Sequence, residues 1–434
     1  MGLPGFHGHP YEFVLPCSFD PAKILLTCRL RKRLDDARWF VATILRRSMG
    51  RKSERRPFVH LRAALLKRVM YGHDYAAVID ELLYAKVVER SPYVVRRCSF
   101  GYRLSQRYIN DCHVQVEATD DRLIGRMRAL HEERNQQLSD RMLPVHHALR
   151  EQQTRLEING EVAREILHGI PRSNPFDVQG ILVKDIEDKR FRFNVGKYGR
   201  VTNNITNLKR ELRCQLHVNG EPLVCTDIAC SQPAFLGKII QSADRGTAEE
   251  RRAEGNEPQR RSIYDSNETL LLCKDTMSRS TVDCSTDHFL ALVQSGELYE
   301  FLLNQLPIIG TRERLKKRLL ADVFAKRKAN SHGSEYPSAV EEVFRKLFPG
   351  VYSFIRSVNR NGWEHENLIR ELQREESRFV IETVAADLMV RNPEMFCITL
   401  HDAIYTTPAN VRLVEQAFER GFAATGFRMS MKTK

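Results

Sequence analysis

The stretch LVCTDIACSQPAFLG, residues 223–237, carries the signals on which the fold of this chain depends. Its apolar start, Leu223 to Cys225, predicts a strand that delivers Asp227 to a strand end. Ser231, Gln232 and Pro233 then close the strand, and a short apolar stretch follows. Because aspartate is also a common turn former, Asp227 taken alone has a purely structural interpretation. Residues further along the chain decide between the two interpretations.

Composition and charge indicate a basic chain with more than one domain. Its 434 residues can form two or three domains, and its 42% hydrophobic and 28% charged residues are ordinary for a globular protein. The net charge is +13, and residues 1–150 hold 27 Lys and Arg against 16 Asp and Glu, a difference of +11. This excess suits a polyanion partner such as nucleic acid, although solvated helix faces produce the same charge pattern.

The sequence also excludes several classes. No apolar run is long enough for a transmembrane helix, and the N-terminus lacks the basic start and apolar core of a signal peptide. We therefore expect no membrane partner and a cytoplasmic location. The ten cysteines are scattered, without a CxxC pair, which favours free thiols over disulfides or a zinc site.

The hydrophobic period changes along the chain. Residues 20–90 and 119–169 carry apolar residues at helical spacing, whereas 91–118 look strand-like or irregular. From 179 the period is two, and GILVKDIEDKRFRFNV predicts a hairpin with its turn near Glu187–Lys189. The remaining expectations are an exposed polar loop over 241–262, helices over 286–328 and 337–391, and strand, turn, strand and helix from 396 onward.

A second candidate carboxylate, Asp402, lies in LHDAIYTT, 175 residues after Asp227. Two such strands can be neighbours in one antiparallel sheet, where the carboxylates would repel each other unless a cation neutralised them. A pair of Mg²⁺ ions, or Mn²⁺ in their place, is the usual arrangement for in-line attack on a phosphate. The alternative is an ordinary hairpin turn in which His401 is satisfied locally.

The helix predicted over 311–328 carries Arg312, Lys316, Leu320 and Phe324 at intervals of four residues. Two cations followed by an apolar and an aromatic side chain suit a nucleoside triphosphate, with the phosphates on Arg312 and Lys316 and the base stacked against Phe324. Lys316 can also supply a proton to the leaving group. The alternative is a plain amphipathic helix whose Leu320 and Phe324 belong to the core.

Taken in order, these segments resemble the family A DNA polymerases and their relatives, the phage-type single-subunit RNA polymerases. Those enzymes have a strand with a metal-binding Asp, a helix that reads R-x3-K-x3-[FY]-x3-Y, and a His-Asp hairpin. A fourth block, GRVTNNITNLKRELR from Gly199 to Arg213, resembles the family's GRL[ST]SSxPNLQNIPxR. The four blocks cover about half of the chain, roughly residues 197–408.

The resemblance implies an α+β, right-hand polymerase fold. It implies a palm over 179–240 and 391–434, fingers over 241–390 and thumb-like helices over 119–178. Residues 1–118 form a basic, mainly helical region that resembles no segment of these enzymes. The implied activity is a template-directed DNA polymerase that transfers a nucleotide from a dNTP to a primer and has no proofreading exonuclease.

The resemblance also assigns roles to single residues. The metals would be held by Asp227, Asp402 and the backbone of Ile228; the nucleotide would contact Arg312, Lys316, Leu320, Phe324 and Gln232; and the primer and template would contact Arg200, Thr202, Asn207 and His401, with Leu208 also at a matching place.

Departures from the family pattern leave the substrate open. Gln232 stands where the DNA polymerases commonly have Glu against the ribose 2′ position, and its bulk favours deoxynucleotides. DIACS, from Asp227 to Ser231, is closer to the RNA-polymerase version, and Phe324 replaces the more usual Tyr. The alternatives are therefore a single-subunit RNA polymerase or primase that uses rNTPs, and, in another class, a non-catalytic nucleic-acid-binding protein.

Overall fold

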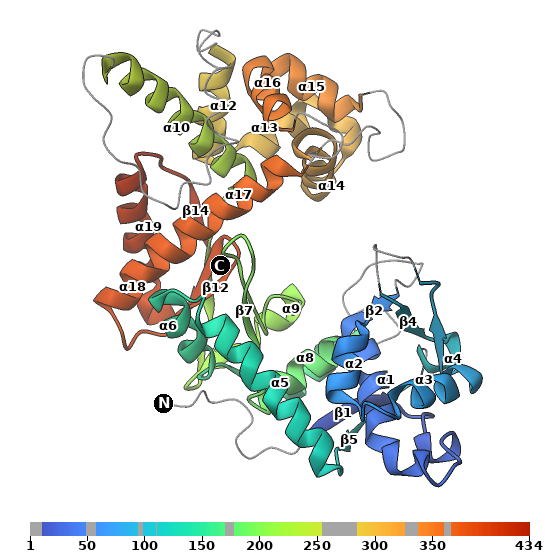
Figure 1. Cartoon of the computed structure of the whole chain (residues 1–434). Coiled ribbons are helices and arrows are strands. Elements are labelled where there is room, and N and C mark those ends of the chain that lie inside the picture. The colour runs from blue at the N-terminus through green and yellow to red at the C-terminus, as the bar shows by residue number, and fades with distance from the viewer. Residues whose placement is uncertain are drawn as a thin grey trace. The chain divides into compact units, whose positions relative to one another are not determined.

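The computed structural model describes residues 11–48, 58–93, 99–109, 111–169, 178–253, 284–325, 337–359 and 366–434. The chain forms two compact units, and each is described by itself. Unit 1 comprises Met1–Met142, Leu156–Phe193 and Asn203–Asn219, and unit 2 comprises Leu143–Arg155, Asn194–Thr202 and Gly220–Lys434. Both units combine helices with small antiparallel sheets, so the fold class is α+β (Figure 1).

Unit 1 consists mainly of helices with three small sheets. Its helices are α1 (Leu34–Ser48), α2 (Ala63–Val69), α3 (Tyr75–Tyr84), α4 (Gln106–Ile109), α5 (Asp121–Ser139), α7 (Gly160–Gly169), α8 (Val178–Glu187) and α9 (Arg210–Arg213). Its strands are β1 (Glu12–Pro16), β2 (Val59–His60), β3 (Val88–Arg90), β4 (Gly101–Leu104), β5 (His113–Glu117), β6 (Glu157–Ile158) and β9 (Leu216–Val218). β1 pairs with β5, β6 pairs with β9, and β4 lies between β2 and β3.

The core of unit 1 is built around α1. This helix carries two acidic residues in its first turn and Arg46 and Arg47 in its last turn, which is the charge order that the helix dipole favours. Phe40, Ile44 and Leu45 from its inner face are fully buried. The predicted helices within 20–90 and 119–169 are therefore confirmed, with short strands at β2, β3 and β6 between them.

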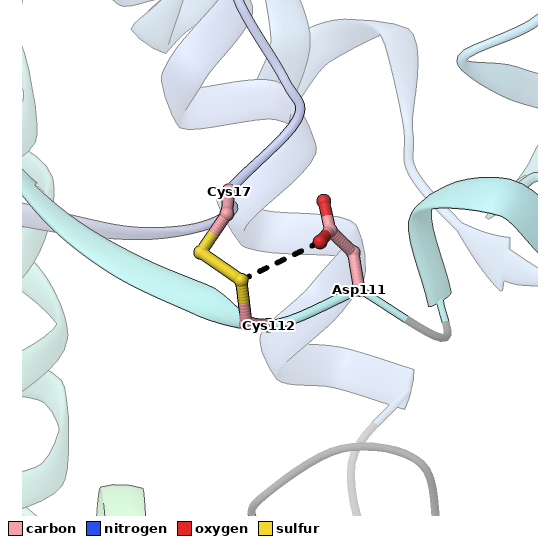
Figure 2. Close-up of side chains that lie close together, drawn as sticks. All are labelled: Cys17, Asp111 and Cys112. Atoms are coloured by element: carbon pink, nitrogen blue, oxygen red, sulfur yellow. Dashed lines mark hydrogen bonds between the residues drawn. A yellow bond between two sulfur atoms is a disulfide. The ribbon is translucent and has the colours of Figure 1, made fainter.

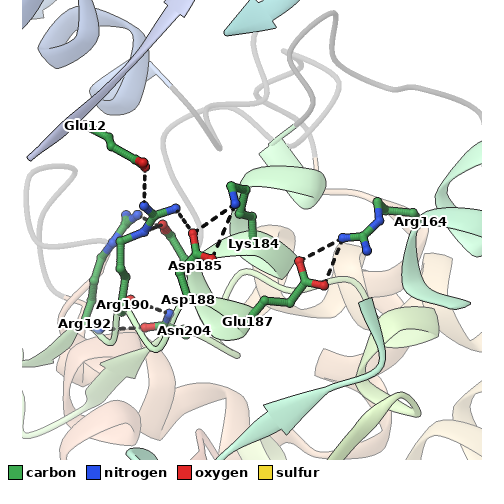
Figure 3. A network of polar contacts seen from close by, with 9 residues as sticks. All are labelled: Glu12, Arg164, Lys184, Asp185, Glu187, Asp188, Arg190, Arg192 and Asn204. Carbon is green, nitrogen blue, oxygen red and sulfur yellow. Dashed lines mark hydrogen bonds and ion pairs between the residues drawn. The ribbon is translucent and has the colours of Figure 1, made fainter. Parts of the chain in front are cut away.

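The predicted hairpin over 180–195 is wrong, because residues 178–187 form the helix α8. Val183, Asp185 and Ile186 are buried on one side of this helix, so a carboxylate occupies a core position that the period of apolar residues could not reveal. Arg190 holds Asp185 with a 3.2 Å contact and also pairs with Glu12 of β1 at 2.6 Å. Figure 3 shows the whole network, in which Asn204 accepts a hydrogen bond from the backbone N of Arg192 and donates one to the carbonyl of Arg190.

The prediction that all cysteines are free is also wrong, because Cys17 and Cys112 form a disulfide with their Cα atoms 5.5 Å apart (Figure 2). The two residues follow β1 and precede β5, and their backbones join through a 2.8 Å hydrogen bond from Cys17 N to Cys112 O. Antiparallel pairing, not sequence spacing, brings them together. Asp111 lies beside them, and these three side chains are the described group of potential metal ligands within 4.8 Å of one another. Since the two sulfurs are bonded to each other, they are not available as thiolate ligands.

Unit 2 contains a four-stranded sheet covered by helices. Its helices are α6 (Pro144–Gln153), α10 (Ser231–Ala253), α12 (Cys284–Ser295), α13 (Leu298–Gln305), α14 (Arg312–Arg318), α15 (Ala339–Leu347), α16 (Pro349–Val358), α17 (Asn367–Ser377), α18 (Ala386–Arg391) and α19 (Val411–Thr425). Two π-helical segments, Leu319–Phe324 and Arg378–Ala385, continue α14 and α17. The strands of the sheet are β11 (Val224–Ile228), β12 (Ile398–Leu400), β13 (Ala403–Thr406) and β14 (Met431–Thr433), in the order β12-β13-β11-β14. Three short strands, β7 (Phe193–Val195), β8 (Val201–Asn203) and β10 (Glu221–Pro222), lie where the chain passes between the units.

Phenylalanines fill the core of unit 2. Phe379 stacks on Phe422 of α19 with ring centroids 5.3 Å apart, and Phe348 packs against both Phe289 and Phe344. The predicted helices over 337–391 and the strand, turn, strand and helix after 396 are confirmed for the described residues. The polar loop predicted over 241–262 is wrong for 241–253, which continue α10, and its remainder lies outside the described residues.

Candidate active site

The site is built on the sheet of unit 2, where the two predicted carboxylates come from neighbouring strands. β11 pairs antiparallel with β13, and Asp227 lies opposite Ala403, the residue that follows Asp402. The backbone N of Ile228 donates to the carbonyl of Asp402 at 3.3 Å. Residues that are far apart in the sequence are thus joined directly by the register of one antiparallel pair.

Two strained backbone positions accompany the carboxylates. His401 (φ +55°) is the first residue of the two-residue turn between β12 and β13, where hairpin geometry requires a positive φ. Cys230 (φ +53°) lies between β11 and α10, and its thiol donates to the carbonyl of Gly296 at 3.1 Å. Non-glycine residues in this region cost on the order of 1 kcal/mol each and cluster at functional sites. The turn therefore holds Asp402 in a fixed backbone position.

Asp227 already attracts a cation from its own chain. The Lys434 ammonium lies 2.6 Å from Asp227 Oδ2, and Asp227 Oδ1 is shielded from solvent without a hydrogen-bond partner. Burial raises the pKa of the Cys225 thiol to about 11; the charges of Asp227 and Asp402 act in the same direction, and Lys434 opposes them. Both carboxylates and the ammonium therefore lie within electrostatic reach of one sulfur atom.

These observations test whether a divalent cation suits the site. Carboxylate oxygens are the ligands that Mg²⁺ and Mn²⁺ prefer. Asp227 Oδ1 has no hydrogen-bond partner, and Asp227 Oδ2 already contacts the positively charged ammonium of Lys434. Asp402 adds negative charge from the neighbouring turn. The residues present fit a hard divalent cation.

A third carboxyl, Glu376, belongs to the same neighbourhood, and sequence patterns did not reveal it. Glu376 of α17 is only 1% exposed, and it accepts hydrogen bonds from Arg200 at 2.6 Å and from Gln232 at 3.0 Å. Burial raises its pKa to about 7, and the charge of Asp402 acts in the same direction, whereas Arg200 and Gln232 oppose the shift. Glu376 therefore joins two predicted site residues from separate segments. A buried glutamate in a helix rich in charged residues has no pattern that could have identified it.

A glycine allows the Arg200 segment to approach α17. Gly199 has φ +75°, and a Cβ atom there would lie 3.2 Å from Ser377 Cβ, tighter than ordinary contact. Only glycine combines this backbone conformation with so close an approach. Arg200 is thereby held beside Glu376.

The helix predicted to bind the nucleotide changes type half-way along. Arg312 begins α14, where it pairs with Glu300 at 2.8 Å and lies 5.0 Å from the ring centroid of Tyr299. Its Nη2 also lies 3.6 Å from Cys230 Sγ, which places the start of α14 beside the end of β11. Lys316, one turn later, is exposed.

The expected stacking of a base on Phe324 needs correction. The helix widens to a π-helix from Leu319, and Ala325 N donates to Leu320 O, five residues back. In a π-helix, residues four apart no longer lie on the same face, so Phe324 does not share a face with Arg312 and Lys316. Leu320 is half-buried, whereas Phe324 is fully buried and packs edge-on against Phe344 at 6.4 Å. Phe324 presents no free ring face to a base in this structure.

The remaining predicted contacts with primer and template are distributed over both units. Thr202 and His401 are exposed in unit 2. Asn207 is exposed in unit 1, where its carbonyl accepts a 3.0 Å hydrogen bond from Gln179, and Leu208 is buried there. The block from Gly199 to Arg213 thus contributes to both compact units.

Comparisons with known proteins give little further information. No family model matches the chain, and no curated protein matches it. Among the solved structures that match is the POL domain of Pol1 from M. smegmatis, in complex with DNA primer-template and dNTP, with 13% identity and a TM-score of 0.31. The match covers 63% of this chain and 55% of that one, so the chain spans about half the length of that structure. A likeness of this size carries no argument. Among the described helices, none is long and apolar enough to cross a bilayer.

Proposed function

We propose that the protein is a template-directed nucleotidyltransferase, and specifically a DNA polymerase with a right-hand arrangement. The observation that carries this proposal is the pairing of β11 with β13, which joins Asp227 to the His401–Asp402 turn in one sheet. Two carboxylates at adjoining strand ends, near a helix that begins with an arginine, form a set of groups suited to phosphoryl transfer.

In this proposal, unit 2 supplies the catalytic groups. Asp227, Asp402 and the backbone carbonyl of Ile228 would hold Mg²⁺, which lowers the pKa of an attacking hydroxyl and neutralises charge on the phosphates when it is bound. Lys434 would then compete with Mg²⁺ for the charge of Asp227, because its ammonium contacts Asp227 Oδ2 at 2.6 Å.

Arg312 and Lys316 would bind the triphosphate. The Arg312 guanidinium is oriented by Glu300 and lies beside Cys230, close to the strand that carries Asp227. Lys316 is exposed one turn further along α14 and would meet the leaving phosphates as a point charge. Phe324 has no role in this proposal, because its ring belongs to the core.

Gln232 would face the sugar and favour deoxynucleotides by its bulk. Its amide nitrogen donates to the buried Glu376, which limits the positions that the side chain can occupy. The palm would comprise 179–240 and 391–434, the fingers 241–390 and the thumb 119–178, with primer and template meeting Arg200, Thr202, Asn207 and His401.

Primer extension tests the proposal. Purified protein, Mg²⁺ and a primed template are combined with dNTPs or rNTPs, on DNA or on RNA, and with or without the primer. We expect extension with dNTPs that Asp227→Ala and Asp402→Ala each abolish. Glu419→Ala is the matched control, because it removes an exposed carboxylate of the same unit that pairs with Arg428 at 2.8 Å. Extension that survives both site variants would refute the proposal.

The other outcomes identify the alternatives. Extension with rNTPs but not dNTPs would indicate an RNA polymerase, and synthesis without a primer would indicate a primase. Salt-dependent binding of nucleic acid without extension, and without any effect of Asp227→Ala, would indicate a non-catalytic binding protein.

A further inference from the structure

Three aromatic side chains are exposed in one short part of unit 1. Tyr84 is 87% exposed, Tyr93 55% and Phe100 37%, and these are the exposed Phe and Tyr residues of the described chain. Large rings are usually buried, and exposed ones that gather together mark a contact surface. This group lies between the end of α3 and the start of β4.

Two of these rings lie side by side, and an arginine covers one of them. The ring centroids of Tyr93 and Phe100 are 5.4 Å apart, and the Arg90 guanidinium lies 4.9 Å from the centroid of Phe100. On β4, the Arg103 guanidinium lies 4.6 Å from the ring of Phe58. Strand alternation places this second pair on the other face of the sheet, because Arg90 pairs with Tyr102 whereas Arg103 pairs with Glu89.

A glycine of β4 allows the close packing of Phe58. A Cβ atom on Gly101 would lie 2.5 Å from Phe58 Cβ and 2.9 Å from Ser91 Oγ. Its absence lets Phe58 lie across β4, and the backbone N of Gly101 donates to Ser91 Oγ at 2.9 Å. Gly101 therefore fixes the packing of Phe58 on that face, and the pairing of β3 with β4 holds Arg90 beside Phe100 on the other.

A cavity of about 750 Å³ adjoins this surface. Three cations line it, Lys86, Arg90 and Arg107, together with one carboxylate, Glu89. Glu89 pairs with Arg103 at 2.6 Å, and Arg90 lies 3.6 Å from Asp80. Lys86 and Arg107 have no carboxylate partner among the described residues, so their charge is available to an anion. Since Arg90 both lines the cavity and covers Phe100, the cavity and the rings form one surface.

We propose that this surface binds single-stranded nucleic acid. Unpaired bases would stack on Tyr93 and Phe100, and the backbone phosphates would meet Lys86 and Arg107 at the cavity. Tyr84 lies in the chain between two residues that line the cavity, and its ring is exposed. A duplex hides the faces of its bases, so it cannot use the rings. This surface lies entirely in unit 1 and does not depend on the activity proposed for unit 2.

The test is fluorescence anisotropy with the full chain and a labelled oligothymidylate about twenty nucleotides long, with an oligouridylate and a duplex as further arms. We expect Tyr93→Ala and Phe100→Ala each to weaken single-strand binding at least about fivefold, because a base loses its stacking partner. Replacing Lys86 and Arg107 with Gln is expected to reduce the slope of log K against log salt by about 0.7 for each lost phosphate contact.

Matched controls come from the same unit. Leu26→Ala removes an exposed apolar side chain, and Arg122→Gln removes an exposed cation, both away from the surface. Neither is expected to change binding. Circular dichroism confirms that each variant is folded, and every variant is repeated with Asp227→Ala, which separates this surface from the site of unit 2.

The proposal would be overturned if the Tyr93→Ala/Phe100→Ala double variant bound single strands as tightly as the unchanged protein. An equal loss of binding to single strand and duplex would overturn it as well, because stacking predicts a difference between them. Comparison of the oligothymidylate with the oligouridylate shows whether the surface prefers DNA or RNA.

Discussion

The Glu376 carboxyl gives a prediction whose magnitude follows from its surroundings. It is 1% exposed, and its burial raises its pKa to about 7 from an ordinary value of 4.5. The folded protein therefore binds this proton more tightly than the unfolded chain does. The stabilisation is fully present below about pH 4.5 and is lost as the pH rises through about 7. With one pKa unit worth about 1.4 kcal/mol, the change amounts to about 3 kcal/mol.

Glu376→Gln removes this titration and keeps the shape of the side chain. The free energy of unfolding is measured by circular dichroism in urea, without divalent ions, at pH values from about 5 to 8. The difference in unfolding free energy between the unchanged protein and the variant should shift by about 2.5 kcal/mol over this range, with the unchanged protein relatively more stable at the acid end. Glu375→Gln is the control, because it removes the next carboxyl of α17, which pairs with Lys238 at 2.8 Å.

Arg200 supplies a second check on the same carboxyl. Its guanidinium lowers the pKa of Glu376 against the effect of burial. Arg200→Met should therefore raise the pKa of Glu376, so that the stabilisation from its proton is lost at a higher pH than in the unchanged protein. A stability difference for Glu376→Gln that stays flat from about pH 5 to 8 would refute the reasoning, because a buried carboxyl of this kind must titrate there.

Three further predictions concern other parts of the chain. Lys434→Met should tighten Mn²⁺ binding about two- to fivefold, because the exposed ion pair of Lys434 with Asp227 is worth at most about 1 kcal/mol. Electron paramagnetic resonance measures the Mn²⁺ affinity. An equal effect of Lys432→Met would mean that Lys434 acts through general electrostatics and not through direct competition with the metal. Phe324→Ala should lower the free energy of unfolding by about 3–5 kcal/mol, because the ring is fully buried; a loss of nucleotide affinity with unchanged stability would contradict this. Cys17→Ser should destabilise unit 1 by about 2–4 kcal/mol in thermal unfolding, because the disulfide closes a loop with a sequence separation of 95. Cys112→Ser should have the same effect. Unequal effects of the two variants would mean that the loss of the disulfide is not the cause.

The sequence by itself determined the elements with a strong and simple period. Helical spacing identified α1 and the helices over 337–391, and alternation around a short turn identified the hairpin of β12 and β13. The strand before Asp227 could be predicted in the same way, from a β-branched apolar run closed by turn residues. These signals are local, since each depends on residues within one or two turns of the chain.

Only the tertiary structure decided which charged residues are buried and which residues meet. Asp185 occupies a core position because Arg190 neutralises it, so the period of α8 could not be seen from apolar residues. Glu376 belongs to the candidate site only because α17 packs beside Arg200 and Gln232. Phe324 leaves the stripe predicted for the nucleotide because a π-helical turn changes the residue spacing. Burial and long-range pairing set these outcomes, and neither leaves a periodic trace in the sequence.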